Sequence, residues 1–401
     1  MILKFIYKGL SLKSAVFPFL IIFCFLLSSC SQLKVKKEII DNNNTGGYRL
    51  AQCDLNSDGT AEIITIGIGI KIIYQNQTIY LDNKIDGLID IECFDVDKDN
   101  FNDLVITSDS VFNPYTKLRK NGAVSWLRNP RGTIQKKWQE KTIVTLDAPH
   151  RTDIVSIASA YYLILSTLYS QRGNKLIRAL NMDDVKNKLD PGYLYIFKFD
   201  YEDKKPQLNE IFKSNGFKFL HGMRTKKIRD SNYITQIGSY EGLTQFQIKY
   251  VKNKINISET KLITQSMALN GVGDSQPLYS SINKFKLLTI EPWHGDNLNY
   301  YEFDGKLLVK TKLNSKGLKM GHDFLHLKTN SKYSYEVLSC HKGEGGAGII
   351  LHRKSKKTNK WSSKMIDKGI GCESVWPVTD SSGQFYVIDG VNNKLLKYDL
   401  N

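Results

Sequence analysis

The sequence predicts an all-β protein, a seven-bladed β-propeller of four-stranded antiparallel blades that follows an N-terminal signal peptide. From residue 47 onward, short runs rich in Ile, Val, Tyr and Phe alternate with Gly, Asn, Asp and Ser, a pattern typical of strands joined by tight turns. Residues 47–401 hold seven such units of about 51 residues, a length that suits a propeller repeat. Helical periodicity is nearly absent, and its one candidate, Leu176–Leu189, is interpreted as an insertion. Two β-sandwiches are the alternative fold, and they fit the even spacing less well.

Composition excludes several other classes of protein. Of the 401 residues, 41% are hydrophobic and 24% are charged, which are globular proportions and not those of a disordered, collagen-like or coiled-coil chain. Only one long apolar run exists, at the N-terminus, so a polytopic membrane protein is excluded. The net charge of +16 comes mostly from Lys spread along the chain, without a basic stripe interleaved with aromatic residues, so no nucleic-acid partner is expected.

The first 29 residues have the pattern of a secretory signal peptide. They carry Lys4, Lys8 and Lys13 and no acidic residue, and they contain the apolar run Ala15–Leu27. A run this short cannot span a bilayer as a permanent helix, but it matches the apolar part of a signal peptide. We therefore predict a signal peptide over residues 1–29, a flexible tether over 30–46, where polar residues and an Asn run dominate, and the propeller over 47–401.

The segment Leu27-Ser28-Ser29-Cys30 resembles the bacterial lipobox. The resemblance implies cleavage before Cys30 and acylation of that cysteine, so that the chain is anchored to a membrane of the bacterial cell envelope. Ser31 stands where retention in the inner membrane usually requires Asp, which favours the outer membrane. An ordinary secretory signal with a chance cysteine is the alternative.

The predicted blades begin near residues 46, 87, 150, 218, 278, 321 and 371. The first two units align on their acidic residues, which places Cys53 and Cys93 at matching positions in neighbouring inner strands. We expect these two cysteines to pack as buried thiols. Cys340 and Cys372 are placed so that they could pair across adjacent blades in an oxidising compartment.

Acidic residues in the first two units form the pattern of calcium-binding loops. The residues are Asp54, Asn56, Asp58 and Glu62 in the first loop and Asp95, Asp97, Asp99 and Asp103 in the second. Alternate acids on a tight turn place several oxygens around one point, which suits calcium, and Gly59 permits the sharp turn. Asx turns without a metal are the alternative. The loops resemble FG-GAP or VCBS repeats, which implies structural calcium in these two blades and none in the other five, where the acids are missing.

Five of the seven histidines fall at equivalent places in the predicted blades. His150, His221 and His322 stand at the starts of first strands, and His294 and His341 follow second strands. In a propeller these two places open on the same face and the first strands line the central channel, so five imidazoles should converge at one channel mouth. Imidazole is the usual ligand of transition metals and the usual general base near neutral pH, so we expect a functional site there, with a transition metal or magnesium as its ion.

Other polar residues occupy equivalent positions around the predicted channel mouth: Arg151, Tyr240, Glu241, Asp296, Lys342, Glu373 and Asp389. Trp293 adds a flat apolar surface on which a sugar ring could stack. The insertions at 109–122 and 170–191 would rise from the same face, and long loops on a rigid scaffold are where binding residues usually lie.

Several short motifs stand in an order that resembles the propeller of fungal aldos-2-ulose dehydratase and its bacterial relatives. They are carried by Trp126, Asn129, Pro130, Trp138, His150, Arg151, His221, Gly222, Glu291, Pro292, His294, Gly295, Gly321 and His322. The resemblance implies an enzyme that eliminates water from oxidised sugars with the help of a metal ion. That family also carries cupin and lectin modules after its propeller, and this sequence ends at Asn401.

Two classes of function are therefore predicted. The first is a lipid-anchored binding propeller that recognises a carbohydrate or a protein at the channel mouth. The second is a metal-dependent carbon–oxygen lyase, or dehydratase, that acts on keto-sugars or glycosides. Its predicted metal ligands or bases are His150, His221, His294 and His322, and its predicted oxyanion stabilisers are Arg151 and Lys342. Further ligand contacts are expected from Trp293, Asp296, Tyr240, Glu241, His341 and Glu373.

Overall fold

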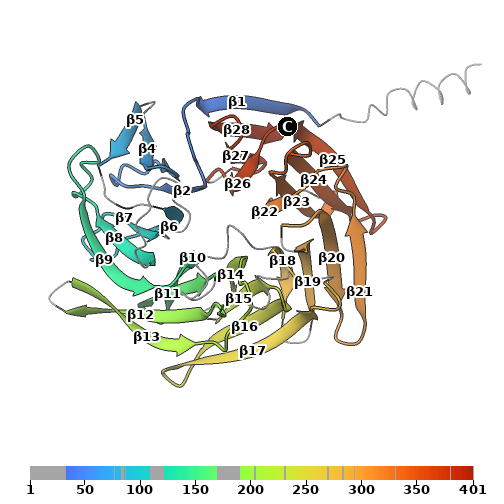
Figure 1. The fold of residues 1–401 in the computed structure, drawn as a ribbon, viewed down its shortest axis with the longest axis horizontal. Coiled ribbons are helices and arrows are strands. Elements are labelled where there is room, and N and C mark those ends of the chain that lie inside the picture. The colour runs from blue at the N-terminus through green and yellow to red at the C-terminus, as the bar shows by residue number, and fades with distance from the viewer. Residues whose placement is uncertain are drawn as a thin grey trace, which may run out of the picture.

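Figure 1 shows the computed structural model, which describes residues 33–400 apart from 76, 83–84, 86, 109–121, 169–189, 203–204, 230–231, 269–270, 282–283, 293, 330 and 380. The predicted signal peptide, Cys30, Trp293 and nearly all of the two insertions, with Leu176–Leu189, lie outside the described residues. Within the described part of the chain, no helix is long and apolar enough to cross a membrane.

Seven four-stranded antiparallel sheets are arranged as blades around a central axis (Figure 1), which confirms the predicted fold class. The first blade comprises β2 (Arg49–Cys53), β3 (Glu62–Ile66), β4 (Ile70–Tyr74) and β5 (Gln77–Leu81). The second comprises β6 (Leu88–Phe94), β7 (Asp103–Ser108), β8 (Gly122–Arg128) and β9 (Gln139–Leu146). The third comprises β10 (Pro149–Ile157), β11 (Ala160–Thr167), β12 (Leu194–Glu202) and β13 (Lys205–Lys213).

The remaining blades repeat this plan. The fourth comprises β14 (Met223–Arg229), β15 (Asn232–Ser239), β16 (Gly242–Val251) and β17 (Lys254–Thr264), and the fifth β18 (Asp274–Ser280), β19 (Phe285–Glu291), β20 (Asn297–Phe303) and β21 (Leu308–Leu313). The sixth comprises β22 (Gly321–His326), β23 (Tyr333–His341), β24 (Gly348–Ser355) and β25 (Trp361–Lys368). The seventh comprises β26 (Cys372–Pro377), β27 (Gln384–Asp389), β28 (Lys394–Leu400) and, from the N-terminal side, β1 (Val35–Asp41).

The first strand of each blade lies innermost. β2, β6, β10, β14, β18, β22 and β26 contact one another in sequence, and β26 contacts β2, so these seven strands close a ring around the axis. Side chains at the start of these strands are therefore brought together from all blades. The outermost strands have mostly exposed side chains, as in β13 and β17, because only one of their faces packs against a neighbouring blade.

Strand β1 closes the propeller, and this corrects the prediction that residues 30–46 form a tether. β1 pairs antiparallel with β28, from Val35 opposite Leu400 to Asp41 opposite Leu395. Lys37 also lies 2.6 Å from Asp367 of the sixth blade. The prediction failed because an outermost strand needs few apolar residues. The exposed Lys and Glu side chains of β1 therefore gave this segment the composition of a polar linker.

Apolar side chains fill the space between neighbouring blades, and two disulfides link adjacent blades across it. Cys340 of β23 bonds to Cys372 of β26, with Cα atoms 5.2 Å apart, which confirms that this pair can form. Cys53 and Cys93 also form a disulfide, between β2 and β6 with Cα atoms 6.2 Å apart, and the prediction of two free thiols is wrong. Their matching positions on neighbouring inner strands bring them within the range that a disulfide requires.

Candidate metal and ligand site

Four of the five predicted histidines bring their rings together at the start of the innermost strands. The ring centroid of His221 lies 4.8 Å from that of His150, 4.5 Å from that of His294 and 6.0 Å from that of His322. The rings of His294 and His322 are 5.0 Å apart. The four residues come from β10, the segment before β14, the loop after β19, and β22. Blades three to six thus contribute one residue each to what we call the histidine cluster.

Three of these rings can share one metal ion. One nitrogen each from His221, His294 and His322 lies within 4.8 Å of the other two, and Nε2 of His294 is 3.0 Å from Nε2 of His221. Nitrogen ligands placed about 2.0–2.1 Å from a tetrahedral zinc ion are about 3.3 Å apart. Small side-chain rotations therefore suffice to bring all three nitrogens to one ion.

Backbone carbonyls fix the tautomers of two of these imidazoles. Nδ1 of His221 lies 2.9 Å from the carbonyl oxygen of Gly273, and Nδ1 of His322 lies 2.5 Å from the carbonyl oxygen of Glu373. Because a carbonyl only accepts, each Nδ1 carries the hydrogen and each Nε2 keeps a lone pair. Nε2 of His322 is buried and has no hydrogen-bond partner among the described residues. A ring fixed in this way is suited to ligate a metal through Nε2.

Burial keeps the four imidazoles neutral. Desolvation, followed by the positive charge of Arg151, lowers the pKa of His221 to about 3. Desolvation is also the main cause that holds the pKa of His150, His294 and His322 well below its usual range. A neutral imidazole is the form that binds a metal ion or accepts a proton, so the cluster is in the protonation state that either role requires.

The backbone is left-handed two residues before each first-strand histidine of the cluster. The residues at this position are Ala148, Phe219 and Met320, with φ angles of 42°, 52° and 50°. The corresponding residues of blades one, two and five are glycines, namely Gly46, Gly87 and Gly271. A side chain in this region costs roughly 1–2 kcal/mol that glycine avoids. Such strain is found preferentially at functional sites, and here it recurs beside the histidines.

Two of the predicted ligand-binding residues hold the segments that carry the histidines. The Glu241 carboxylate accepts the backbone amide of Lys218 at 3.0 Å, just before the histidine of blade four. The Asp296 carboxylate accepts the backbone amide of Met320 at 3.0 Å, just before the histidine of blade six. Tyr240 is half-buried, and its backbone amide donates to the carbonyl of Lys218. These contacts give Glu241 and Asp296 a positioning role.

Lys342 and Glu373 form an ion pair beside the cluster. Nζ of Lys342 lies 3.1 Å from Oε2 of Glu373, and the same oxygen is 3.7 Å from Nδ1 of His322. The predicted oxyanion stabiliser Lys342 therefore already has a carboxylate partner. Asp389, also predicted at the mouth, is buried and accepts the backbone amide of Gly371 at 2.9 Å.

His341 does not join the cluster, which corrects the expectation of five converging imidazoles. Its Nε2 lies 3.0 Å from Oγ of Ser339, which is 2.9 Å from Nε2 of His352. Nδ1 of His352 lies 2.9 Å from Oγ of Ser363. All four side chains belong to β23, β24 and β25 of the sixth blade. The ring at the end of β23 is thus directed toward its own sheet and not toward the axis.

Tyr48 belongs to the site although the sequence pattern did not indicate it. Its ring meets that of His322 edge-on, with centroids 5.9 Å apart, and the guanidinium carbon of Arg151 lies 5.6 Å from its centroid. Tyr48 follows the left-handed Gly46 by two residues, as His150 follows Ala148. Aligning the units on these turns would have found it.

A ring of charged residues adjoins the cluster on the innermost strands. It consists of Arg49, Asp90, Arg224, Asp274 and Asp323. Arg49 lies 3.0 Å from Asp90 and 3.3 Å from Asp323, while Arg224 lies 2.8 Å from Asp274 and also contacts Asp323. Asp90 and Asp323 further accept backbone amides of β10 and β26. The charged ring therefore links all seven innermost strands, and its charges are mutually satisfied.

The two predicted calcium loops share one backbone plan. Asp54 accepts the amides four and five residues later at 3.2 and 2.9 Å, and Asp95 does the same at 3.0 and 2.8 Å. Glu62 and Asp103 each accept an amide from the residue seven positions earlier. Left-handed residues also recur in register: Ser57 and Gly59 in the first loop, Lys98 and Asn100 in the second.

The second loop gathers its acids more tightly. Asp95, Asp97 and Asp99 place carboxylate oxygens within 4.8 Å of one another. Burial, followed by repulsion from Asp99, raises the pKa of Asp97. Nη2 of Arg128 lies 2.6 Å from Oδ2 of Asp97, so the chain's own guanidinium partly neutralises the group. Oδ1 of Asp97 remains buried without a hydrogen-bond partner among the described residues.

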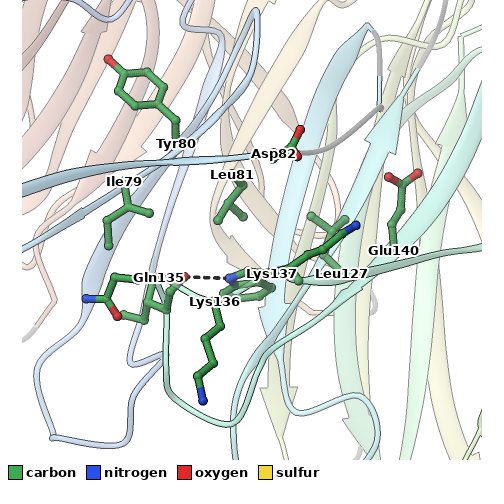
Figure 2. A pocket seen from close by; sticks show the side chains of 11 residues that line it. Ile79, Tyr80, Leu81, Asp82, Leu127, Gln135, Lys136, Lys137 and Glu140 are labelled. Atoms are coloured by element: carbon green, nitrogen blue, oxygen red, sulfur yellow. Dashed lines mark hydrogen bonds between the residues drawn. The ribbon is translucent and has the colours of Figure 1, made fainter.

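A surface pocket of about 240 Å³ lies between the first and second blades, apart from the histidine cluster (Figure 2). It is bounded by Ile79–Leu81 of β5 and by the segment before β9. Trp138, one of the motif residues, is buried there and donates from Nε1 to the carbonyl of Ile134 at 3.1 Å. Trp138 therefore has a structural role, and no histidine lines this pocket.

The fold and the site define a seven-bladed β-propeller with a buried histidine cluster at the start of its innermost strands. No protein-family description and no curated protein matches the sequence. Among solved structures, 244 chains match the fold. One of them, described as BBS1N in complex with ARL6DN, soaked with lead, has a TM-score of 0.51 and 10% sequence identity. The match covers 90% of this chain and 95% of that chain, and at this identity it shows a likeness of fold alone.

Proposed function

We propose that this chain is a ligand-binding β-propeller whose histidine cluster holds one divalent transition-metal ion, and that a carbohydrate binds at this ion. The observation that carries the proposal is the convergence of ring nitrogens from His221, His294 and His322, which belong to three different blades. A protein ligand at the same place is the alternative.

The chemistry of the donor set favours a transition metal over magnesium or calcium. Magnesium and calcium prefer oxygen ligands, whereas neutral imidazoles suit zinc, copper, iron or nickel. The carbonyl partners of the two Nδ1 atoms orient the rings, as outer partners do in metal sites. Three protein ligands leave further coordination positions, and these are where a ligand oxygen can bind. The support for a carbohydrate is the motif order that resembles the dehydratase propeller.

Metal analysis of the purified protein tests this proposal. We expect about one transition-metal ion per chain in the wild type after purification without added metal, and none in His322→Gln. The matched control is His326→Gln, because this half-buried histidine of β22 lies outside the cluster and should leave the metal content unchanged. A wild-type protein that takes up no stoichiometric ion, even when Zn²⁺ is supplied, contradicts the proposal.

A carbon–oxygen lyase is the second candidate, and the position of His150 favours it. This buried imidazole lies 4.8 Å from that of His221, with the two rings tilted, and is followed in β10 by Arg151. In such a lyase, His150 removes the proton next to a carbonyl and Arg151 stabilises the enolate oxygen. The protonated His150 then returns this proton to the leaving hydroxyl as the carbon–oxygen bond breaks, which releases water and an unsaturated ketone. Incubation with an aldos-2-ulose should then produce ultraviolet absorption of the unsaturated product. His150→Gln should abolish this product while the metal content stays unchanged.

We also propose that the protein is anchored in the cell envelope by lipid on Cys30. Cys30 precedes the first residue of β1 by only five positions, so a lipid there would hold the seventh blade close to the membrane. Cys30→Ala should release the protein from the detergent phase into the aqueous phase. A variant that partitions with the detergent as the wild type does contradicts the anchor.

A further inference from the structure

Arg151 is a buried arginine beside the histidine cluster that takes part in no ion pair among the described residues. It is 6% exposed, and its Nη1 has no hydrogen-bond partner there. The neighbouring buried arginines differ, because Arg49 and Arg224 each contact two aspartates. A buried guanidinium is costly unless an anion pairs with it, so Arg151 lacks a direct anionic partner among the described residues.

The guanidinium of Arg151 lies at the cluster itself. Its carbon lies over the ring of Tyr48, 5.6 Å from the ring centroid, and this ring also meets that of His322 edge-on. Arg151 also directly follows His150 in β10, and the ring of His150 lies 4.8 Å from that of His221. One small molecule could therefore contact both the proposed metal ion and this guanidinium.

The carboxylates nearby are already engaged. The aspartates of the charged ring are held by Arg49 and Arg224, and Glu373 is held by Lys342. The cluster histidines are neutral, so they add no negative charge, and a divalent ion would add two positive charges. The charged ring has three aspartates against two arginines, so its one excess negative charge offsets Arg151, and Lys342 offsets Glu373. The two charges of a divalent ion would then be uncompensated, and a neutral ligand would leave them so.

We infer that the ligand of the histidine cluster carries a carboxylate, which binds the free edge of Arg151, and that it is an acidic sugar such as a uronate. The inference rests on the proposed function, because it names the class of ligand at the same site. The planar guanidinium presents its donors in one plane, which matches a carboxylate and gives a charge-assisted pair. Hydrogen bonds to charged groups contribute about 1.5–3 kcal/mol, so the pair should strengthen binding at least about tenfold.

Calorimetric titration of the Zn²⁺-loaded protein with galacturonate, its methyl ester and galactose tests the inference. The methyl ester keeps the shape of the sugar acid and removes its charge, so this comparison needs no variant. We expect galacturonate to bind at least about tenfold more tightly than either neutral sugar. Arg151→Met should abolish this preference, and Arg151→Lys should restore part of it, with melting temperature and bound zinc measured to show that each variant is folded and loaded.

Three results would overturn the inference: equal affinity for galacturonate and its ester, no binding of galacturonate at millimolar concentration, or displacement of galacturonate by inorganic phosphate at lower concentration than by free carboxylates. The outcome is separable from that of the proposed function. If the protein binds zinc at the cluster but does not prefer the acid, the proposed metal site stands and only the inference of a ligand carboxylate fails. If the protein binds no zinc, the proposed metal site itself is contradicted.

Discussion

The histidine cluster at the axis and the histidine pair inside the sixth blade are both buried, but they use their nitrogens differently. In the pair, both Nε2 atoms contact Oγ of Ser339, and Nδ1 of His352 contacts Oγ of Ser363. In the cluster, Nδ1 of two rings contacts a backbone carbonyl, and one ring nitrogen from each of three blades approaches the other two.

This difference separates a structural from a functional histidine better than burial does. Hydroxyl groups can donate or accept, so Ser339 and Ser363 satisfy Nε2 of both rings and Nδ1 of His352 in either tautomer. A carbonyl fixes one tautomer, so the opposite nitrogen presents a lone pair: Nε2 of His322 has no hydrogen-bond partner among the described residues, and Nε2 of His221 lies 3.0 Å from Nε2 of His294. A buried lone pair without a donor is rare in proteins unless an ion or a ligand completes it.

Replacing a cluster histidine should have the largest effect. Both His294→Gln and His322→Gln should lower the affinity for Zn²⁺ by about 100-fold or more, because each removes one of three direct ligands. Competition with a chromophoric chelator measures this affinity. His352→Gln serves as the control and should bind Zn²⁺ as the wild type does. An equal loss of zinc affinity in all three variants would contradict the distinction between the histidine cluster and the histidine pair of the sixth blade.

Ser339→Ala should destabilise the fold without affecting the metal. The change leaves Nε2 of both His341 and His352 buried without a partner, which should reduce the free energy of unfolding by about 2 kcal/mol. Urea unfolding measures this loss. Ser363→Ala, which removes one contact of a half-buried hydroxyl, should cost less. If Ser339→Ala also lowers zinc affinity, the pair and the cluster are not independent.

The pair should also make stability depend on pH. Burial lowers the pKa of His352 to about 3, against about 6.5 in an unfolded chain. The unfolded state therefore takes up the proton first, so this contribution to stability is complete above about pH 6.5 and is lost as the pH falls toward 3. The loss is at most about 1.4 kcal/mol per pH unit. His352→Gln should flatten the fall of the melting temperature between pH 6.5 and 5, and an unchanged slope would contradict this.

Calcium should have the smallest effect, because its proposed loops lie at the surface. A chelator should lower the melting temperature by roughly 2 °C, since an ion bound only to the folded state stabilises it. Asp58→Ala combined with Asp99→Ala should abolish this sensitivity. In Arg128→Gln the second loop loses its internal cation, so the chelator should have a larger effect than in the wild type. If the chelator leaves the melting temperature of the wild type unchanged, the calcium proposal is contradicted.

Much of the fold could be predicted from the sequence, because turn residues recur at the spacing of a blade. The same spacing placed His150, His221 and His322 at the starts of innermost strands. Strand β1 was missed because an outermost strand carries polar side chains on most positions. The disulfide between Cys53 and Cys93 was missed because sequence alone does not give the distance between two strands.

The site was predicted less completely, for physical reasons. His341 stands after a second strand as His294 does, but its side chain is directed into the sheet, and that direction depends on local geometry that the sequence pattern does not reveal. Tyr48 was overlooked because it is neither acidic nor an imidazole. The charged ring was overlooked because its members are scattered over the chain and meet only when the propeller closes.

Titration with Co²⁺, followed by its visible absorption, tests the central claim most directly, because this ion reports both its own binding and the geometry of its ligands. The account predicts a saturable spectrum at one equivalent per chain in the wild type and in His352→Gln, and its loss in His294→Gln and His322→Gln. A spectrum that does not saturate, or one that survives both cluster substitutions, would contradict a metal centre formed by His221, His294 and His322.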